Sequence, residues 1–428
     1  MPKVFTHDMR LGADPSRVVV RPFHLAWHAS SGNPSRTARL VEHVLLLDEK
    51  TIDDQLATVM HDFEKRHWQI RQVFEKRFQD INSRLKLDET KLRDQTKLLI
   101  GAYFCHEYSY SAAALMNPSI VRHPDQSGMA DGSVRFLMAL RAVGEGHISS
   151  IPFREGIVTP ERTIELQPEP PFATAADVLD LHSDLENPDA SVSVHRHRES
   201  AISGTVLFPV TNAQANGIED LRLTEFTHAD GSTEYIGTYT AYSGHSIRSE
   251  LLRTKDFRQF DLIPMRGNAA QDKGMALFPR TFDGKYRMIG RQDKQNLFLL
   301  ESDDLETWQG GTLLMEPKYP WELVQIGNCG PPVEIDEGWL VLTHGVGAMR
   351  KYSIGAMLLD KKDPSKVIGR TKQPILTAAN QDREGYVPNV VYTCGSIPVG
   401  EDLFIPYGVA DSSIAFGFIK IAELLEDM

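Results

Sequence analysis

Two adjacent carboxylates and an arginine stand together in the stretch Gly217-Ile218-Glu219-Asp220-Leu221-Arg222-Leu223. Carboxylic acids can transfer protons in a reaction, and arginine can hold an anion or orient an acid. The apolar residues of this stretch predict a short strand, in which successive side chains point to opposite faces. We therefore expect Glu219 and Asp220 to have different roles, with one of them facing a cavity. A turn carrying solvated acids is the alternative.

Composition limits the possible functions of this 428-residue chain. Its length predicts two domains, or one large all-β unit with an appendage. The formal charge of -12 argues against a nucleic-acid partner, because nucleic-acid binding depends on basic surface. The three cysteines, Cys105, Cys329 and Cys394, are too few for a disulfide framework or a zinc site. With no signal-peptide core and no apolar run of spanning length, we expect a cytoplasmic protein without a membrane partner.

The first quarter of the chain has a helical pattern. A strand is predicted at 17–21 and a helical segment around 37–47. Apolar residues from Ile52 to Ile81 then recur at three-, four- and seven-residue steps, which predicts one face of a long helix. Asp88 is expected to cap a second helix that runs through Tyr103. This apolar stripe favours a packed helical appendage over a cofactor groove or a dimer seam, although self-association through these helices is possible.

From about residue 112 onward the pattern becomes that of short strands separated by Gly, Asn, Asp and Pro turns. Spacing of this kind over some 300 residues favours a propeller or a large sandwich over alternating strands and helices. Predicted strands are 134–143, 205–210, 235–242, 286–289, 297–300, 339–343, 387–392 and 403–407.

A faint internal repeat favours the propeller. The segment 302–308 carries acidic turn residues and ends in Trp308, and the segment 253–257 ends similarly in Phe257. Residues 153–156 are a weaker third copy. In such a repeat the aromatic ring packs between sheets, so we assign Trp308 to packing.

Residues 158–200 interrupt this pattern with five prolines amid acidic residues, which predicts a surface excursion. Within it, His195-Arg196-His197-Arg198 could form a metal or anion patch. A solvated strand edge is the stronger interpretation, because no carboxylate or third histidine accompanies the pair.

Several segments together resemble glycoside hydrolase family 130, whose members are five-bladed β-propeller enzymes acting on β-mannosides. The segments are 117–120, 218–222, 272–279, 327–346, 358–370, 385–391 and 407–411. The resemblance implies a mainly β fold, with residues 112–428 as a five-bladed β-propeller catalytic domain and residues 1–111 as an N-terminal α-helical extension. It is carried most specifically by Leu-Leu-Asp-Lys-Lys-Asp-Pro-Ser-Lys-Val-Ile-Gly-Arg at 358–370 and Val-Pro-Asn-Val-Val at 387–391.

The resemblance makes Asp220 the single general acid. Most characterised members of the family cleave a β-mannosidic bond with inorganic phosphate and invert the anomeric centre. The leaving oxygen must gain a proton as the oxocarbenium-like transition state develops. Leu221 stands where the family usually has proline, which changes the restraint on the backbone but leaves the acid in place. Glu219 and Arg222 then become positioning residues in the substrate-binding set.

A phosphorylase needs cations to hold phosphate, whereas an inverting hydrolase needs a second carboxylate to activate water. The resemblance assigns phosphate binding to four residues: Arg141, Lys273, Arg291 and His344. Taken singly, each has an ordinary structural explanation, such as a surface lysine or a buried histidine. Arginine supplies paired donors and lysine a point charge, which suits a tetrahedral dianion. Gly274, where an aspartate often follows the lysine, is expected to loosen that loop.

Further residues are expected to bind the sugar. The resemblance gives Asp411 and Asn117 contacts with the mannosyl unit, and Tyr242 is a candidate stacking ring, as are Tyr239 and Tyr352. The expected ligands are a mannoside oligosaccharide and phosphate as co-substrate, with no cofactor and no metal. The predicted reaction releases α-mannose 1-phosphate. Two alternatives stay open: an inverting β-mannosidase on the same scaffold, and a non-catalytic glycan-binding propeller.

Overall fold

The computed structural model describes residues 4–23, 25, 35–178, 187 and 189–428. The chain is mainly β with helices near its N-terminus, and it divides into two compact units. The β unit comprises Met1–Pro15, Tyr110–Pro170 and Ala176–Met428, and the helical unit comprises Ser16–Ser109 and Pro171–Ala175. The predicted boundary at 111 and 112 therefore misplaces the N-terminal strand. Strand β1 (Phe5–Gly12) belongs to the β unit because it pairs antiparallel with β29 (Ser413–Lys420).

The helical unit contains four α-helices among its described residues: α1 (Arg36–Leu45), α2 (Glu49–Phe63), α3 (Ile70–Leu85) and α4 (Asp94–Tyr103). The expected long helix is thus two helices, and the prediction was wrong on this point. The chain leaves the helix after α2, and the buried His67 side chain contacts Glu107 at 2.7 Å. Phe63 and Ile70 are seven residues apart, so the apolar stripe continues across the break and hides it.

The expected cap at Asp88 opens a short 3₁₀ turn, η1 (Glu89–Lys91), instead of an α-helix. Its carboxylate accepts a hydrogen bond from the backbone of Thr90, and α4 begins only at Asp94. A two-stranded ribbon of β2 (Val18–Pro22) and β3 (Cys105–Ser109) completes the helical unit. Self-association through these helices stays a prediction.

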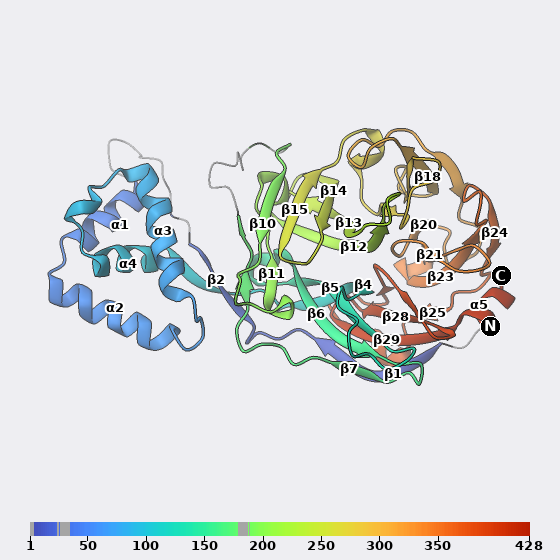
Figure 1. Cartoon of the computed structure of the whole chain (residues 1–428), viewed down its shortest axis with the longest axis horizontal. Helices are drawn as coiled ribbons and strands as arrows, with labels where there is room; N and C mark the ends of the chain where they lie inside the picture. The colour runs from blue at the N-terminus through green and yellow to red at the C-terminus, as the bar shows by residue number, and fades with distance from the viewer. Residues whose placement is uncertain (1–3, 24, 26–34, 179–186, 188) are drawn as a thin grey trace. The chain divides into compact units, whose positions relative to one another are not determined.

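The β unit is built from five antiparallel meanders among its described residues, which follow one another in chain order around the unit in Figure 1. The first meander contains β4 (Ala114–Arg122), β5 (Val134–Val143), β6 (Ser149–Val158) and β7 (Ile164–Leu166). The second contains β12 (Gly217–Thr227), β13 (Thr233–Tyr242), β14 (Ile247–Thr254) and β15 (Gln259–Pro264). The third contains β16 (Ala276–Leu277), β17 (Tyr286–Gly290), β18 (Leu297–Ser302) and β19 (Thr312–Met315).

The last two meanders contain short accessory strands. The fourth contains β20 (Gln325–Asn328), β21 (Val333–Glu334), β22 (Trp339–Val346), β23 (Tyr352–Leu359), β24 (Val367–Arg370) and β25 (Leu376–Thr377). The fifth contains β26 (Val391–Tyr392), β27 (Ile397–Val399), β28 (Asp402–Val409), β29 and, from the other end of the chain, β1. Strand β1, blue in Figure 1, lies beside the red β29. The N-terminal segment therefore completes the C-terminal meander.

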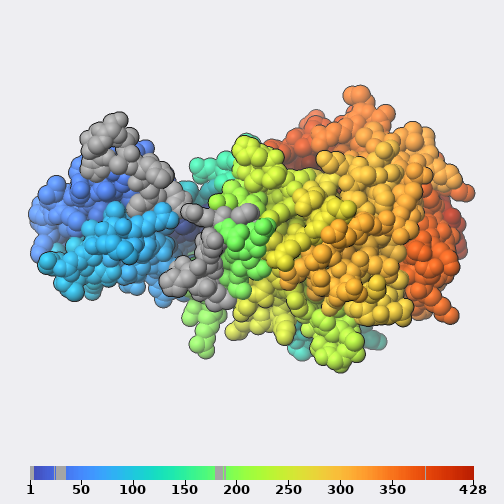
Figure 2. Space-filling view, turned by 90° about the horizontal axis from the view of Figure 1, so that it is seen from above, coloured from blue at the N-terminus to red at the C-terminus, as the bar shows by residue number. Residues whose placement is uncertain are grey.

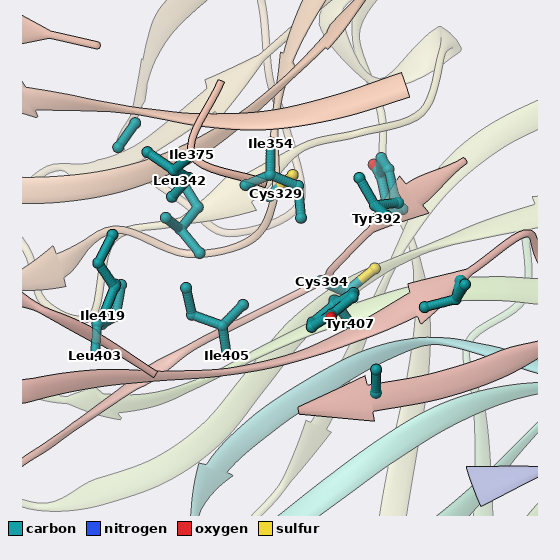
Figure 3. Packing of buried hydrophobic residues seen from close by; sticks show 14 of the residues in the cluster. Cys329, Leu342, Ile354, Ile375, Tyr392, Cys394, Leu403, Ile405, Tyr407 and Ile419 are labelled. Carbon is teal, nitrogen blue, oxygen red and sulfur yellow. The ribbon is translucent and has the colours of Figure 1, made fainter. Parts of the chain in front are cut away.

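Adjacent meanders are joined mainly by side chains. Strand β12 meets β6 through one parallel pair, Gly217 with Ser149, whereas β12 and β13 pair along their length. Separate apolar clusters fill the spaces between successive meanders. Figure 3 shows the cluster of the fourth and fifth meanders, in which Leu342 and Ile354 face Leu403 and Ile405. In Figure 2 the face of the β unit turned to the viewer is mostly yellow and orange, the colours of β14 to β24.

The expected aromatic repeat is present in two of its three copies. Trp308 and Phe257 each follow a strand and an acidic turn, and both are fully buried. Each ring lies in one of the clusters between meanders, as predicted. Residues 153–156 instead lie inside β6, so the third copy was wrong.

Strand β5 has the predicted bounds, whereas the predicted strand at 387–392 is reduced to β26. Pro388 has no backbone N–H to donate, and Asn389 adopts a left-handed φ of 64°. Both features interrupt pairing before Val391.

The excursion at 158–200 contributes β7, β9 (Asp177–Val178) and β10 (Val192–His195) to the sheets. Its residues 179–186 and Pro188 lie outside the described part of the chain. His197 contacts Asp177 at 3.0 Å, and Arg196 donates to the backbone carbonyl of Phe257 at 3.1 Å. The expectation of a solvated strand edge without a carboxylate was wrong, because β10 pairs with β15 on one side and with β9 on the other, and Asp177 accompanies His197. In the described part of the chain, no helix is long and apolar enough to cross a membrane.

Candidate active site

All ten predicted site residues line one cavity of about 360 Å³ in the β unit. Its described lining is Asn117, Arg141, Glu219, Asp220, Arg222, Tyr242, Ile247, Lys273, Gly274, Arg291, Gln325, Gly327, Asn328, His344, Arg350, Tyr352, Val390, Tyr392 and Asp411. These side chains come from all five meanders. Residues up to 294 positions apart in the sequence, from Asn117 to Asp411, therefore share one space.

Each meander contributes to the cavity from the same two places. One is the beginning of its first strand, as for Asn117 in β4 and Gln325 in β20. The other is the connection between its two longest adjacent strands, as for Arg291 after β17 and Asp411 between β28 and β29. Repeating one supersecondary unit around the cavity thus brings polar residues from distant segments to the same end of the sheets.

The acid segment contains a β-bulge. Pairing between β12 and β13 shifts between Glu219 and Arg222, so the two intervening residues face a single partner position. Asp220 has a left-handed φ of 54° within the bulge. The expectation that Glu219 and Asp220 point to opposite faces was therefore wrong, because the bulge interrupts the alternation and directs both carboxylates to the cavity. Leu221 takes the core position and is 3% exposed.

Oδ1 of Asp220 accepts two hydrogen bonds, from Nδ2 of Asn117 at 2.8 Å and from Nη1 of Arg141 at 3.3 Å. Among the described residues no hydrogen bond reaches Oδ2. Burial alone would raise the pKa of Asp220, but the charges of Arg141, Arg222 and Lys273 outweigh burial and hold the pKa below its ordinary value. Without ligand the carboxyl is ionised, and Oδ2 is the position for an added proton.

Arg141 bridges the two neighbouring acids. Its Nη2 donates to Oε1 of Glu219 at 2.7 Å while its Nη1 reaches Asp220. Burial raises the pKa of Glu219, and the charge of Asp220 adds to this effect. The sequence suggested that Arg141 binds phosphate. Its two Nη atoms donate to carboxylates and its Nε donates to Oγ of Ser149 at 3.0 Å, so its charge serves the acid pair and any anion that enters the cavity.

His344 is held in one tautomer by its surroundings. Its Nδ1 lies 3.1 Å from the backbone carbonyl of Asn328, so this nitrogen carries the proton and donates. Its Nε2 then accepts from Nη1 of Arg291 at 3.5 Å. Burial and the charges of Arg291 and Arg222 lower the pKa of His344 well below its ordinary value, so the ring is neutral.

Lys273 lies in the loop that precedes β16. Its side chain makes no ion pair with a carboxylate among the described residues, although the lysine lines the cavity with Gly274. The expected loosening by Gly274 is countered by two hydrogen bonds to the loop. Ser249 donates to the carbonyl of Asp272 at 2.8 Å, and Asn328 Nδ2 donates to the carbonyl of Gly274 at 2.6 Å. The loop is therefore fixed on both sides of Lys273.

Asp411 has a left-handed φ of 49° in the connection between β28 and β29. Burial, together with the charge of Asp220, raises its pKa to about 6. Tyr242 lines the cavity from the end of β13. Tyr239, which was another candidate ring, lies in the core instead, where its hydroxyl donates to Glu250 at 2.6 Å.

Sequence reasoning missed several lining residues, among them Arg350, Asn328 and Tyr392. Tyr392 directly follows the quoted segment 387–391, so its position next to that segment was an available signal. Arg350 lies in a turn that follows β22, and its guanidinium is 6.0 Å from the ring centre of Tyr352. No periodic pattern marks a residue of this kind.

The cavity is cationic within an acidic protein. Five lining side chains are cationic: Arg141, Arg222, Lys273, Arg291 and Arg350. Three carboxylates oppose them, from Glu219, Asp220 and Asp411. The described lining therefore has a formal excess of two positive charges, although the whole chain has a net charge of -12. The arrangement can receive a dianion next to a carboxylic acid.

Comparison with known proteins agrees with the resemblance. Residues 181–428 match a family model, Glyco_hydro_130, described as beta-1,4-mannooligosaccharide phosphorylase. The match covers more than half of the chain. The predicted site residues lie within it except for Asn117 and Arg141, which precede residue 181.

Two curated relatives align with parts of the chain. A beta-1,2-mannobiose phosphorylase from Listeria innocua is 33% identical over 231 residues, covering 52% of this chain and 63% of the relative. A 1,2-beta-oligomannan phosphorylase from Thermoanaerobacter sp. is 36% identical over 155 residues, covering 36% and 52%. The chain thus spans about six tenths and about half of the length of these relatives.

A solved structure shares the fold with a TM-score of 0.53 at 17% sequence identity, covering 74% of this chain and 87% of that one. It is described with the words "The GH130 family of mannoside phosphorylases contains glycoside hydrolases that target beta-1,2 mannosidic linkages in Candida mannan". At this identity the likeness concerns the fold alone.

Proposed function

Because the chain belongs to glycoside hydrolase family 130, we propose that it is a β-mannoside phosphorylase that releases α-mannose 1-phosphate with inversion. The five meanders are then the blades of a five-bladed β-propeller, and the cavity is its central active site. The matching family model and the two phosphorylase relatives support this reaction.

The charge of the cavity is the observation that carries the proposal. The excess of two positive charges in the described lining is equal in size and opposite in sign to the charge of hydrogen phosphate near neutral pH. In the proposed complex, Lys273 and Arg291 hold phosphate and Arg141 contributes its charge. Phosphate then attacks the anomeric carbon from the face opposite the leaving oxygen, which inverts that centre.

His344 has a distinct role in this complex. Its Nδ1–H is already donated to the carbonyl of Asn328, so a neutral ring presents only the lone pair of Nε2. Through this lone pair it can accept a hydrogen bond from the hydroxyl of hydrogen phosphate, or it can keep Arg291 in place. In either case it does not supply positive charge.

Asp220 protonates the leaving sugar oxygen, either directly or through a sugar hydroxyl. Its low pKa without ligand is due to nearby cations, which a bound dianion would offset. Phosphate binding therefore raises the pKa of Asp220 and favours a proton on Oδ2. On this proposal the nucleophile prepares the acid, so protonation and attack occur in the same complex.

The remaining cavity residues bind and orient the mannosyl unit. In the sequence Asn117 precedes the acid segment and Asp411 follows it. Both residues line the cavity, as does Tyr242. Glu219 is fixed by Arg141, and Arg222 by its contacts next to Asp220. We assign sugar contacts to the first three residues and orientation of the acid to Glu219 and Arg222.

Hydrolysis is the second candidate, because the description of the solved structure names hydrolases within this family. An inverting hydrolase needs a base carboxylate in addition to Asp220. Asp411 is in the same cavity and has no ion pair with a cation among the described residues. The cationic excess favours phosphorolysis, since water needs no such charge.

Product identification tests the proposal. The protein is incubated with β-1,2- and β-1,4-mannobiose, with and without phosphate, and the products are separated. Phosphorolysis gives α-mannose 1-phosphate only when phosphate is present. Mannose release that ignores phosphate would establish the hydrolase instead. Binding of mannobiose without turnover, unaltered in Asp220→Asn, would indicate a glycan-binding propeller.

A further inference from the structure

Tyr392 lies at the boundary between the fifth meander and the acid segment. It is the second residue of β26, pairs with Gly408 of β28 and is 9% exposed. In Figure 3 its side chain is at the end of the apolar cluster away from Leu403 and Ile419. It also lines the cavity. The ring is thus packed on one side, while the hydroxyl is on the side of the active site.

The hydroxyl oxygen of Tyr392 accepts a hydrogen bond from Nη2 of Arg222 at 2.6 Å. The two residues are 170 positions apart in the sequence, on the second and fifth meanders. Burial raises the pKa of Tyr392 above its ordinary value, so the hydroxyl stays neutral. It remains a suitable acceptor for the guanidinium.

Arg222 has few other partners. It is 3% exposed, its Nη1 donates to the backbone carbonyl of Asp220 at 3.0 Å, and its Nε has no hydrogen-bond partner among the described residues. Removing the Tyr392 hydroxyl would leave two of its three nitrogens unpaired. A buried charged group in that condition shifts toward another arrangement, because unpaired burial is costly.

The carbonyl that Arg222 holds belongs to the strained residue of the bulge. Asp220 has a φ of 54°, a conformation that non-glycine residues keep only when their surroundings hold it. That conformation directs the carboxyl group toward the cavity. A change at Arg222 therefore reaches the acid through its backbone, without any contact with phosphate.

From these contacts we infer that Tyr392 is a positioning residue for the proton donor, acting through Arg222 on the backbone of Asp220. The inference rests on the proposed function, in which Asp220 is the acid. The inference distinguishes the residues that align the acid from the residues that bind phosphate. Tyr392 governs the alignment of the acid, whereas Lys273 and Arg291 govern phosphate.

A merely structural role for the hydroxyl makes a different prediction. If it only ties the second and fifth meanders together, its loss lowers stability but leaves the kinetics of the folded enzyme unchanged. Tyr235 provides a matched control, since its buried hydroxyl donates to the carbonyl of Arg122 at 3.1 Å outside the cavity. Tyr235→Phe removes the same group from a site that plays no part in the reaction.

The first experiment compares Tyr392→Phe with Tyr235→Phe. We expect Tyr392→Phe to lower kcat by about 10- to 100-fold, the range for a small misplacement of a catalytic group. The KM for phosphate should stay within about twofold of wild type, because this constant depends on Lys273 and Arg291, which Tyr392 does not contact. Both variants should lose thermal stability, and Tyr392→Phe should lose more, because it leaves part of a buried guanidinium unpaired. An unchanged kcat, or a loss confined to the phosphate KM, would overturn the inference.

A double-mutant cycle with Arg222→Lys tests the route of the effect. Lysine keeps the charge but cannot bond the Asp220 carbonyl and the tyrosine together through a planar fork. If Tyr392 acts through Arg222, adding Tyr392→Phe to Arg222→Lys lowers kcat no further. Multiplied losses would show that Tyr392 acts by another route, and the inference would be wrong.

Failure of the proposed function would be visible in the wild type alone. An enzyme that releases mannose without phosphate is not a phosphorylase, yet the same cycle can be measured on its hydrolysis rate. If the wild type shows no turnover, Asp220 is not an acid and the inference falls with the proposed function. If the wild type is active and the losses in kcat of the two single variants multiply in the double variant, the inference about Tyr392 is rejected but the proposed function is not.

Discussion

Asn117 donates a hydrogen bond from Nδ2 to Oδ1 of Asp220 at 2.8 Å, and both residues have left-handed backbones, with φ of 48° and 54°. Each lies where the pairing of its strand shifts, in β4 and in β12. Left-handed conformations are costly for residues other than glycine and persist where the surrounding structure fixes them. In two neighbouring meanders, a left-handed residue at a shift in strand pairing thus directs its polar side chain toward the other. This contact fixes which oxygen of Asp220 remains open.

Asp220→Asn tests the acid. The amide keeps an oxygen that can accept from Asn117, but it cannot donate a proton to a leaving sugar. We expect kcat to fall by about 10²- to 10⁴-fold, the usual contribution of a general acid. The measurement is the initial rate of mannose 1-phosphate release at saturating phosphate.

Asp402→Asn is the matched control for this variant. Asp402 is 5% exposed and pairs with Arg162 at 2.7 Å, outside the cavity. Its loss should lower thermal stability and leave kcat within about twofold. A rate for Asp220→Asn above a tenth of wild type would argue against Asp220 as the acid.

Lys273→Ala tests the phosphate site. Its point charge attracts a dianion, so removing it should raise the phosphate KM by at least about tenfold with a small effect on thermal unfolding. Lys255→Ala is the control, because this lysine is exposed in a turn outside the cavity. Initial rates over a series of phosphate concentrations give both constants. An unaltered phosphate dependence would remove Lys273 from the site.

Asp411→Asn tests the raised pKa of Asp411. Its pKa is about 6 in the folded protein and near 3.8 in the unfolded chain, so the folded state binds more protons between these values. Stability of the wild type therefore falls as pH rises from about 4 to 6, relative to a variant that cannot ionise. Above pH 6 the variant should be more stable by about 1–3 kcal/mol.

Calorimetric melting of Asp411→Asn and wild type at intervals from pH 4 to 7.5 follows this difference. The gap between the two melting temperatures should widen up to about pH 6 and then stay level. A constant gap across the range, or a wild type that gains on the variant as pH rises, would contradict the raised pKa. Asp303→Asn, at an exposed carboxylate outside the active-site cavity, is the control for the loss of a surface charge.

Gly327→Ala tests the fixed position of His344. A Cβ at residue 327 would lie 2.3 Å from Cε1 of His344, and the imidazole cannot move freely because the rings of Tyr352 and Tyr392 are next to it. Overpacking of this kind costs about 1–3 kcal/mol. It also displaces the acceptor for Arg291, so the phosphate KM should rise. Gly12→Ala has open space around it and serves as the control.

Steady-state kinetics and thermal melting of both glycine variants give the comparison. We expect Gly327→Ala to lose stability and phosphate affinity together, while Gly12→Ala keeps both near wild type. If the phosphate KM of Gly327→Ala equals that of wild type, then the hydrogen bond between His344 and Arg291 does not contribute to phosphate binding.

The chemistry of the site is predictable because it depends on residue types in a recognisable order. The acid segment, Lys273 and Asp411 are identified through the resemblance to the family that this order carries, and all of them line the cavity. Strand β5 is predicted to the residue because its apolar run is long and uninterrupted. The buried positions of Trp308 and Phe257 follow from the turn and ring that repeat along the chain.

Other features depend on contacts that local sequence does not encode. The break between α2 and α3 is hidden by a stripe that keeps its spacing across the turn. The pairing of β1 with β29 joins the two ends of the chain, which no neighbouring residue signals. Alternation along β12 predicted opposite faces for Glu219 and Asp220, and a bulge cancelled it.

The acid segment, the set of cations and the order of short strands are therefore all present in the amino-acid sequence. How these groups combine depends on the fold. Arg141 is shared between Glu219 and Asp220, and Tyr392 holds Arg222 from 170 residues away. The physical reason is that hydrogen bonds and charges act through space, whereas a sequence pattern reports only local periodicity.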